Sequence, residues 1–343
     1  LRKMEMAYLE ANTRELELTK HFSLAMEDPA QLLTLRSSGM CQLICTQDMF
    51  DLDYPGHYNR RVKSVSISIP CVAGPYTTIA ATLTQSSATI EDAAGAITAG
   101  FTSPSIVALS GAQNDSGMFE LNLKDERYLP FEGSGALCTW YLSLMDEEIL
   151  RQFDYDTISD VIIHVKYTAA YSDTKRTTRT AELRDAVIGD GVTPIDLPRY
   201  FSLKHEFADG WFAFGNAFPT DSDTQMEIVV DAGMFPFLSN GKDITVKQWE
   251  IMLKPSSPLS HTYKLEVDYP GLSSPILSGS LNTAGNFATT MTLTPVAAIA
   301  AGGSITFKLR LIDQSTLPDP EPVNISELLD DIYVVATYNL SLP

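Results

Sequence analysis

The sequence is poor in basic residues and has no long apolar runs. Its 343 residues include 24 Lys and Arg against 43 Asp and Glu, so the formal net charge is −19 and the isoelectric point is near 4.5. A chain this acidic repels phosphate backbones, and we therefore expect no nucleic-acid partner. The longest apolar runs have only the length of a strand, so no segment is expected to cross a membrane as a helix.

Cysteine is also scarce, with only Cys41, Cys45, Cys71 and Cys138. Cys41 and Cys45 have helical spacing, but no second pair accompanies them, which argues against a zinc site. Four scattered cysteines in a chain of this length do not make a disulfide framework. We expect them to be small buried hydrophobic residues, and we expect no metal or cofactor.

The chain lacks an initial methionine and a secretory signal region, since it begins at Leu1 without a charged and then apolar segment. It is therefore expected to be part of a longer protein, either a cleaved product or a C-terminal fragment. Its length still exceeds one typical domain and allows two cores. With 44% apolar and 20% charged residues, the composition is that of an ordinary globular protein.

Helical patterns are confined to the beginning of the chain. Residues 1–20 predict one long helix with a narrow stripe typical of a coiled-coil seam, formed by Met6, Leu9, Thr13 and Leu16. A short second helix follows, with Asp28 as its N-cap, Pro29 at its first position and Gly39 at its end.

From about residue 42 onward the pattern alternates with period two. In SVSISIP, for example, Val65, Ile67 and Ile69 share one face. Further strands are predicted at 78–84, 118–123, 137–144, 161–168, 224–230, 245–253, 263–267, 304–311 and 332–340. The predicted fold is mainly β: tandem antiparallel β-sandwich-like units, preceded by an N-terminal coiled-coil-like helix.

An internal repeat indicates two β units. Lys63 and Lys247 each stand at the head of an alternating strand, and a short acidic turn precedes an apolar strand in both 156–168 and 326–340. The expected division is as follows: residues 1–41 form a helix end and a short connecting helix, 42–170 a first β unit, 171–197 a polar connector with room for a short helix, and 198–343 a second β unit.

The strongest candidate for chemistry is the group Asp51, Asp53 and His57, whose oxygen and nitrogen ligands could bind a divalent ion. The same stretch contains the turn signal Tyr54-Pro55-Gly56 directly before a strand. In the matching stretch of the second unit, residues 233–235 are Gly, Met and Phe, none of which is a ligand. A structural loop is therefore favoured over a metal site.

Two further motifs are also interpreted as structural. Residues 125–136 hold two glycines two positions apart, but they precede a strand rather than a helix, so a sharp turn with an Arg127–carboxylate contact is favoured over a phosphate loop. His205 and Glu206 have no nucleophile motif beside them. We expect no catalytic residue.

The segment 205–218 is the most aromatic part of the chain. Its aromatic residues are expected to lie in the core, and the alternative is an exposed anchor for a protein partner. The candidate partner-binding residues are Trp211, Phe212 and Phe214.

Several long segments together resemble one family. They are ANTRELELTKHFSL, FDLDYPGHYNRRVKSVSISIPCVAGPYTTIAATLT, FELNLKDERYLPFEGSGA, FDYDTISDVIIHVKYTA and RYFSLKHEFADGWFAF. They look like the C-terminal part of the A component of bacterial Tc (ABC-type) insecticidal toxin complexes.

The resemblance implies a function and partners. The A component would be a secreted or cell-surface homo-pentamer that acts at the host membrane and contacts it only through parts absent from this chain. Residues 1–20 would be the end of its channel helix, and residues 40–343 the β region that includes the B-binding domain. The second β unit, 198–343, would be the platform that binds the B component of the B–C cocoon. The expected role is non-enzymatic docking. The alternatives are a β-sandwich that binds carbohydrate or a host surface and, ranked last, a hydrolase.

Overall fold

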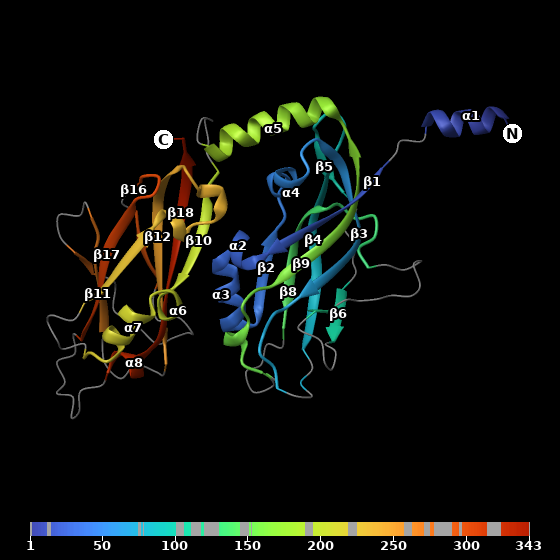
Figure 1. The fold of residues 1–343 in the computed structure, drawn as a ribbon. Helices are drawn as coiled ribbons and strands as arrows, with labels where there is room; N and C mark the ends of the chain where they lie inside the picture. The colour runs from blue at the N-terminus through green and yellow to red at the C-terminus, as the bar shows by residue number, and fades with distance from the viewer. Residues whose placement is uncertain are drawn as a thin grey trace. The chain divides into compact units, whose positions relative to one another are not determined.

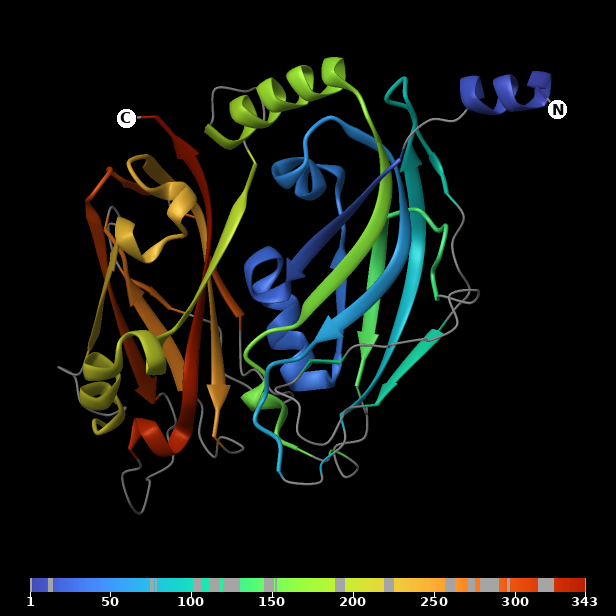
Figure 2. The same cartoon turned by 45° about the vertical axis from the view of Figure 1, so that its right-hand side comes forward.

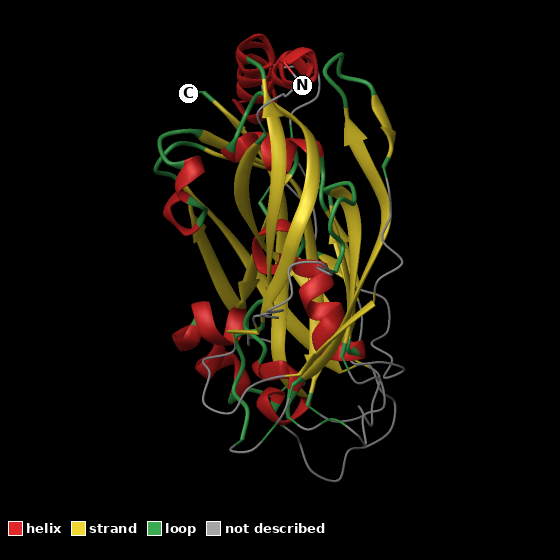
Figure 3. Ribbon diagram, turned by 90° about the vertical axis from the view of Figure 1, so that its right-hand side faces the viewer, coloured by secondary structure: helices red, strands yellow, loops and turns green. Residues whose placement is uncertain are grey.

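The structure is a computed structural model that divides the chain into two compact units, Leu1–Arg184 and Asp185–Pro343 (Figures 1 and 2). It describes residues 2–11, 15–74, 77, 79–100, 106–110, 118–119, 130–144, 151, 153–188, 195–218, 225–256, 263–270, 275–277, 290–294, 297–313 and 324–342. Strands, yellow in Figure 3, are the commonest secondary structure of the described chain. We describe each unit by itself.

The first unit contains two antiparallel sheets. One has the order β1 (Leu16–Ser23), β9 (Ile162–Tyr171), β3 (His57–Ser68) and β7 (Met118–Phe119). The other has the order β2 (Met40–Ile44), β8 (Leu137–Ser143), β4 (Ala80–Glu91) and β5 (Ile97–Ala99), and β6 (Ile106–Ser110) also pairs with β4. Inward side chains of both sheets share one core, which includes Phe22, Val165 and Trp140.

The second unit also contains two antiparallel sheets. One has the order β10 (Leu197–Ser202), β18 (Leu329–Ser341), β12 (Asp243–Pro255) and β15 (Thr290–Leu293), with β16 (Ala297–Ile299) also on β12. The other has the order β11 (Met226–Asp231), β17 (Ser304–Asp313), β13 (Tyr263–Asp268) and β14 (Ile276–Leu277). Trp249 and Phe307, which come from different sheets, pack at a centroid distance of 5.4 Å in the shared core.

Helices connect the strands of the two sheets. The first unit has α1 (Arg2–Ala11), α2 (Leu24–Glu27), α3 (Pro29–Ser38), α4 (Gln47–Asp53) and the short 3-10 helix η3 (Tyr155–Thr157). Helix α5 (Asp173–Ile188) contains the boundary between the units. The second unit has α6 (Leu203–Glu206), α7 (Ala208–Gly215), η4 (Ala232–Met234), η5 (Phe237–Ser239) and α8 (Ile325–Leu328).

The two units repeat one plan. The strand order β1-β9-β3 of the first unit returns as β10-β18-β12 in the second, and β2-β8-β4 returns as β11-β17-β13. In each unit a pair of helices joins the first strand of one sheet to the edge strand of the other. The predicted mainly β, tandem sandwich fold and the predicted repeat are both confirmed.

A serine–aspartate contact, which we call the clamp, recurs at the same place in both units. Ser23 Oγ donates to Asp160 Oδ2 at 2.6 Å, and Asp160 Oδ1 accepts from the backbone N–H of Ala25 at 2.9 Å. In the second unit, Ser202 Oγ donates to Asp331 Oδ2 at 2.6 Å, and Asp331 Oδ1 accepts from the N–H of Lys204 at 3.1 Å. Each clamp joins the start of a short helix to the start of the neighbouring strand. In each clamp the serine is the middle residue of a Phe-Ser-Leu tripeptide.

The prediction of one long helix over residues 1–20 is wrong beyond Ala11. Helix α1 ends at Ala11, and Leu16–Ser23 forms the edge strand β1. The segment 16–23 also alternates, so that Lys20 and Phe22 are buried while His21 is exposed. Pairing with β9 over eight residues decided between the two patterns, because tertiary contacts override local helix propensity.

Other local predictions met different outcomes. The connector contains the 16-residue helix α5 rather than a short one, and the helices α4, α6 and α7 were not predicted. The helix from Asp28 to Gly39 is confirmed, because the Asp28 side chain accepts from the N–H of Gln31 and Gly39 has φ +77°. The buried-cysteine prediction is confirmed for Cys41, Cys45 and Cys138, whereas Cys71 is half-buried; all four are free.

We predict that the two clamps contribute stability in the order of their burial. Ser202→Ala leaves a nearly buried carboxylate oxygen without its donor, at a cost of about 1–3 kcal/mol, and Ser23→Ala costs less because its clamp is only half-buried. Urea unfolding of the purified variants tests this, with exposed Ser304→Ala as the control. Equal midpoints for Ser202→Ala and Ser304→Ala would contradict the prediction.

Candidate functional site

Asp51, the first of the three candidate metal ligands, lies in the last turn of α4. Phe50 and Asp51 are the two buried residues of this helix, and Asp51 is only 1% exposed. A carboxylate this deeply buried needs charged partners, because an unpaired buried charge is very costly. Its partners therefore determine what the site can do.

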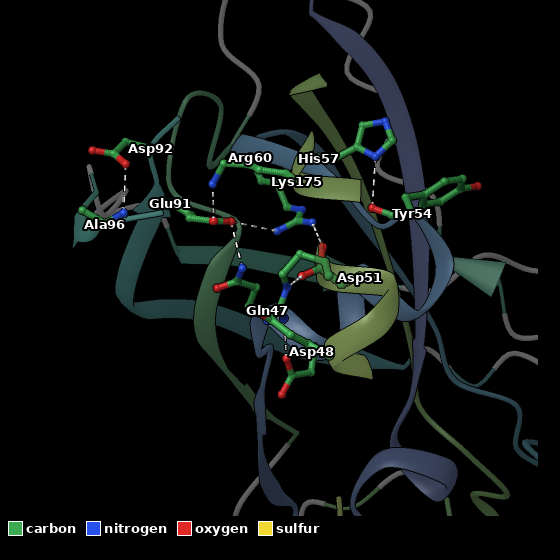
Figure 4. Close-up of polar contacts among 12 residues, drawn as sticks. Gln47, Asp48, Asp51, Tyr54, His57, Arg60, Glu91, Asp92, Ala96 and Lys175 are labelled. Atoms are coloured by element: carbon green, nitrogen blue, oxygen red, sulfur yellow. Dashed lines mark hydrogen bonds and ion pairs between the residues drawn. The ribbon is translucent and has the colours of Figure 1, made fainter. Parts of the chain in front are cut away.

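Both carboxylate oxygens of Asp51 are bound by arginines. Arg60, which is buried on β3, donates from Nη2 to Asp51 Oδ1 (Figure 4). Arg179 on α5 donates from Nε to Asp51 Oδ2 at 2.8 Å. Arg179 also donates to Asp48 and Glu182, each at 2.7 Å. Asp51 is therefore held between two cations and presents no oxygen to solvent.

Glu91 at the end of β4 forms the second half of this cluster. Its carboxylate accepts from Lys175 Nζ of α5 at 2.6 Å and from Gln47 Nε2 of α4 at 2.9 Å (Figure 4). Arg60 Nη1 lies 3.9 Å from Glu91 Oε2 and so links the two halves. We call Asp51, Arg60, Glu91, Lys175 and Arg179 together the buried ion cluster.

The buried ion cluster has a structural role that the local geometry explains. Burial lowers the pKa of Arg179, but its hydrogen bonds to Asp51, Glu182 and Asp48 outweigh that effect and raise the pKa above the ordinary value, so Arg179 stays charged. Helix α5 is thereby anchored to α4 and β4. The turn at Gly56 fits closely beneath α5: its φ is +84°, and a Cβ there would lie 2.5 Å from the Cβ of Arg176.

The structure does not bring the three candidate ligands to one point. Asp53 accepts from Lys20 Nζ at 2.7 Å, and His57 Nδ1 donates to the carbonyl oxygen of Tyr54 at 3.0 Å (Figure 4). Asp51 faces Arg60 and Arg179 instead. Within the described part of the chain, no group of three or more His, Cys, Asp and Glu side chains is placed to hold a metal ion.

The glycine-containing segment forms a sharp turn where the structure describes it, from residue 130. Ser134 N–H donates to the Phe131 carbonyl at 3.1 Å, and Gly133 has φ +77°. Gly135 lies so close to β4 that a Cβ would stand 2.5 Å from the Thr89 carbonyl oxygen. The predicted turn is confirmed for this part, whereas Arg127 lies outside the described residues.

His205 and Glu206 do not form a catalytic pair. Both are exposed on α6, and Glu206 accepts from Arg199 Nη2 at 2.6 Å and from the N–H of Ser202 at 3.3 Å. Glu206 thus stabilises the start of the helix. This arrangement gives no support to the hydrolase alternative.

The three aromatic candidates for partner binding occupy different environments on α7. Trp211 and Phe214 are 9% and 1% exposed and belong to the core of the second unit. Phe212 is 74% exposed. A buried Trp211 cannot present a stacking face to a sugar, which removes the residue on which the carbohydrate alternative depended. Of these three candidates, only Phe212 exposes its side chain to a partner.

The first unit is therefore a two-sheet antiparallel β-sandwich whose buried charges hold its own elements together. Residues 1–169 match the sequence profile of the family described as the Tc toxin complex TcA C-terminal TcB-binding domain. The resemblance found in the sequence is thus confirmed for residues 1–169, which are similar to the TcB-binding domain of Tc toxin A components.

One toxin subunit of similar sequence agrees with this match. The chain is 39% identical over 191 residues to toxin subunit YenA2 of Yersinia entomophaga, a match covering 50% of this chain and 14% of YenA2. Solved structures of Yersinia pseudotuberculosis TcaA-TcaB and Morganella morganii TcdA4 are each 24% identical over 49% of this chain, covering 10% and 8% of theirs. Their TM-scores, 0.36 and 0.33, are too low to carry any argument.

We predict that Asp51→Asn destabilises the first unit by about 3–5 kcal/mol, because it leaves the buried Arg60 without its closest anion. Glu17→Gln is the matched control: its partner Lys63 is also cationic, but the two side chains are 67% and 42% exposed, so the cost is below about 1 kcal/mol. Urea unfolding measures both. Similar midpoints for the two variants would show that the cluster is not required for stability.

Proposed function

We propose that this chain is a non-enzymatic docking part of a Tc toxin A component and that its first unit binds the B component. The observation that carries the proposal is the profile match over residues 1–169, which covers all but the end of the last strand of the first sandwich. The buried ion cluster supports a non-enzymatic role, because the acidic residues most suited to chemistry are bound by arginine and lysine side chains.

The wider assembly is part of the same proposal, since the chain spans only 14% of the length of YenA2. Residues 1–41 would contain the end of the translocation-channel helix and the short connecting helix. Residues 42–170 would form the first β unit, 171–197 a connector and 198–343 a second β platform. On α1, Met6 of the predicted seam is 62% exposed, as expected of a side chain that packs against other A chains in a pentamer.

The proposed place of action is the host cell membrane, after secretion or display on the bacterial surface. None of the helices in the described part of the chain is long and apolar enough to cross a bilayer. In the proposal, contact with the membrane is made by other parts of the A component, and this chain joins the channel to the B–C cocoon.

A direct test is binding of the whole chain to a purified Tc toxin B component by biolayer interferometry. We expect saturable association at or below micromolar concentration. A β-sandwich protein of similar negative charge serves as the control for nonspecific attraction. If the B component binds neither protein, or binds both alike, the proposed function is wrong.

Phe212 remains a proposed second contact. Phe212→Ser should leave the thermal midpoint unchanged, because the side chain is 74% exposed, and should weaken binding of the B component. Phe237→Ser is the matched control, since Phe237 is 88% exposed in the same unit. Equal affinities for both variants and the unaltered chain would rule out the contact.

A further inference from the structure

The first unit has one sheet face without any charged side chain. Outward-pointing residues of β2, β8 and β4 form this surface, which we call the uncharged face. Its apolar members are Met40, Ile44 and Tyr141, which are 46%, 54% and 45% exposed. The other outward residues of these three strands, up to position 86 of β4, are alanine at 80, glutamine at 42, threonine at 82, 84 and 139, and serine at 86 and 143.

The strand register places the apolar members beside one another. Gln42, Tyr141 and Thr84 stand opposite one another across the three strands, with Tyr141 in the middle. Met40 and Ile44 lie two residues to either side of Gln42 on β2. Cross-strand neighbours are about 5 Å apart and same-face neighbours along a strand about 7 Å apart, so the three side chains border one continuous patch.

The same face of the second unit is built differently, although the strand order is the same. There, β11, β17 and β13 place Glu227, Lys308 and Asp268 opposite one another. A second cross-strand pair joins Glu266 and Arg310. Opposite charges on neighbouring strands are the usual way to keep a sheet face in water. The lack of charge in the first unit is therefore a property of its residues and not a consequence of the fold.

We propose that the uncharged face is the surface on which the first unit docks the B component, an inference that rests on the proposed function. The face lies within the matched residues 1–169, and its charged counterpart lies outside them. Depletion of charge with exposed Tyr and Met side chains is typical of the centre of a protein interface.

The partner meets side chains rather than extending the sheet. Strand β2 is an edge strand, but the backbone N–H of Gln42 already donates to Gln31 Oε1 of α3 at 3.0 Å. This bond removes a donor that an added strand would need. Shape complementarity to Tyr141 and Ile44 is therefore the expected source of affinity.

The test compares four variants of the whole chain for binding to a purified B component. Tyr141→Glu and Ile44→Glu each place a charge on the face and should weaken the dissociation constant about tenfold or more. Val229→Glu is the matched control, because Val229 is 45% exposed at the corresponding edge strand of the second unit, and its affinity should be unchanged. Tyr141→Thr keeps strand propensity and removes the ring, so it should weaken binding without a change in fold.

The outcomes separate the two proposals. If the unaltered chain fails to bind the B component, the proposed function fails. If it binds and Tyr141→Glu, Tyr141→Thr and Ile44→Glu bind equally well, the function stands and the uncharged face is not the docking surface. An equal loss in Val229→Glu would also overturn the assignment. Thermal midpoints of all variants are measured alongside, and Tyr141→Thr decides the matter if the glutamate variants unfold.

Discussion

The first unit depends on the buried contact between Asp51 and the guanidinium groups of Arg60 and Arg179. Burying these charges is costly, and the cost is offset only because every carboxylate oxygen in the cluster has a cationic or amide partner. Four elements meet there: α4, β3, β4 and α5. The cluster thereby fixes the turn that starts β3 and anchors the helix in which the first unit ends.

The two sandwiches share one strand order but differ in the chemistry of their outward residues. Both use a Ser–Asp clamp to join a short helix to a long strand, and both bury one face of each sheet. They differ on the outside, where the first unit presents Tyr141 among uncharged neighbours and the second presents charged pairs. Only the first unit lies within the matched TcB-binding family, so the difference in surface chemistry accompanies a proposed difference in role.

Sequence periodicity predicted the inner parts of the long strands β3, β9, β12 and β18, because each holds a run of alternating or mostly apolar residues. It failed at Leu16–Ser23, where Leu16 fits both the helical stripe and the alternating strand, and pairing with β9 decides between them. The buried ion cluster was not predictable either. Asp51 and Arg179 are separated by 128 residues, and nothing local shows that they meet. Asp51 was singled out for its residue type, but its partners lie too far away in sequence to be inferred.

The most direct measurement of the central claim is hydrogen–deuterium exchange of the whole chain, with and without a bound Tc toxin B component. Docking on the first unit predicts slower exchange in Met40–Ile44 and Leu137–Ser143, the strands that carry the uncharged face. It also predicts little change in Met226–Asp231, the corresponding edge strand of the second unit. Protection confined to the second unit, or no protection in either, would contradict the account.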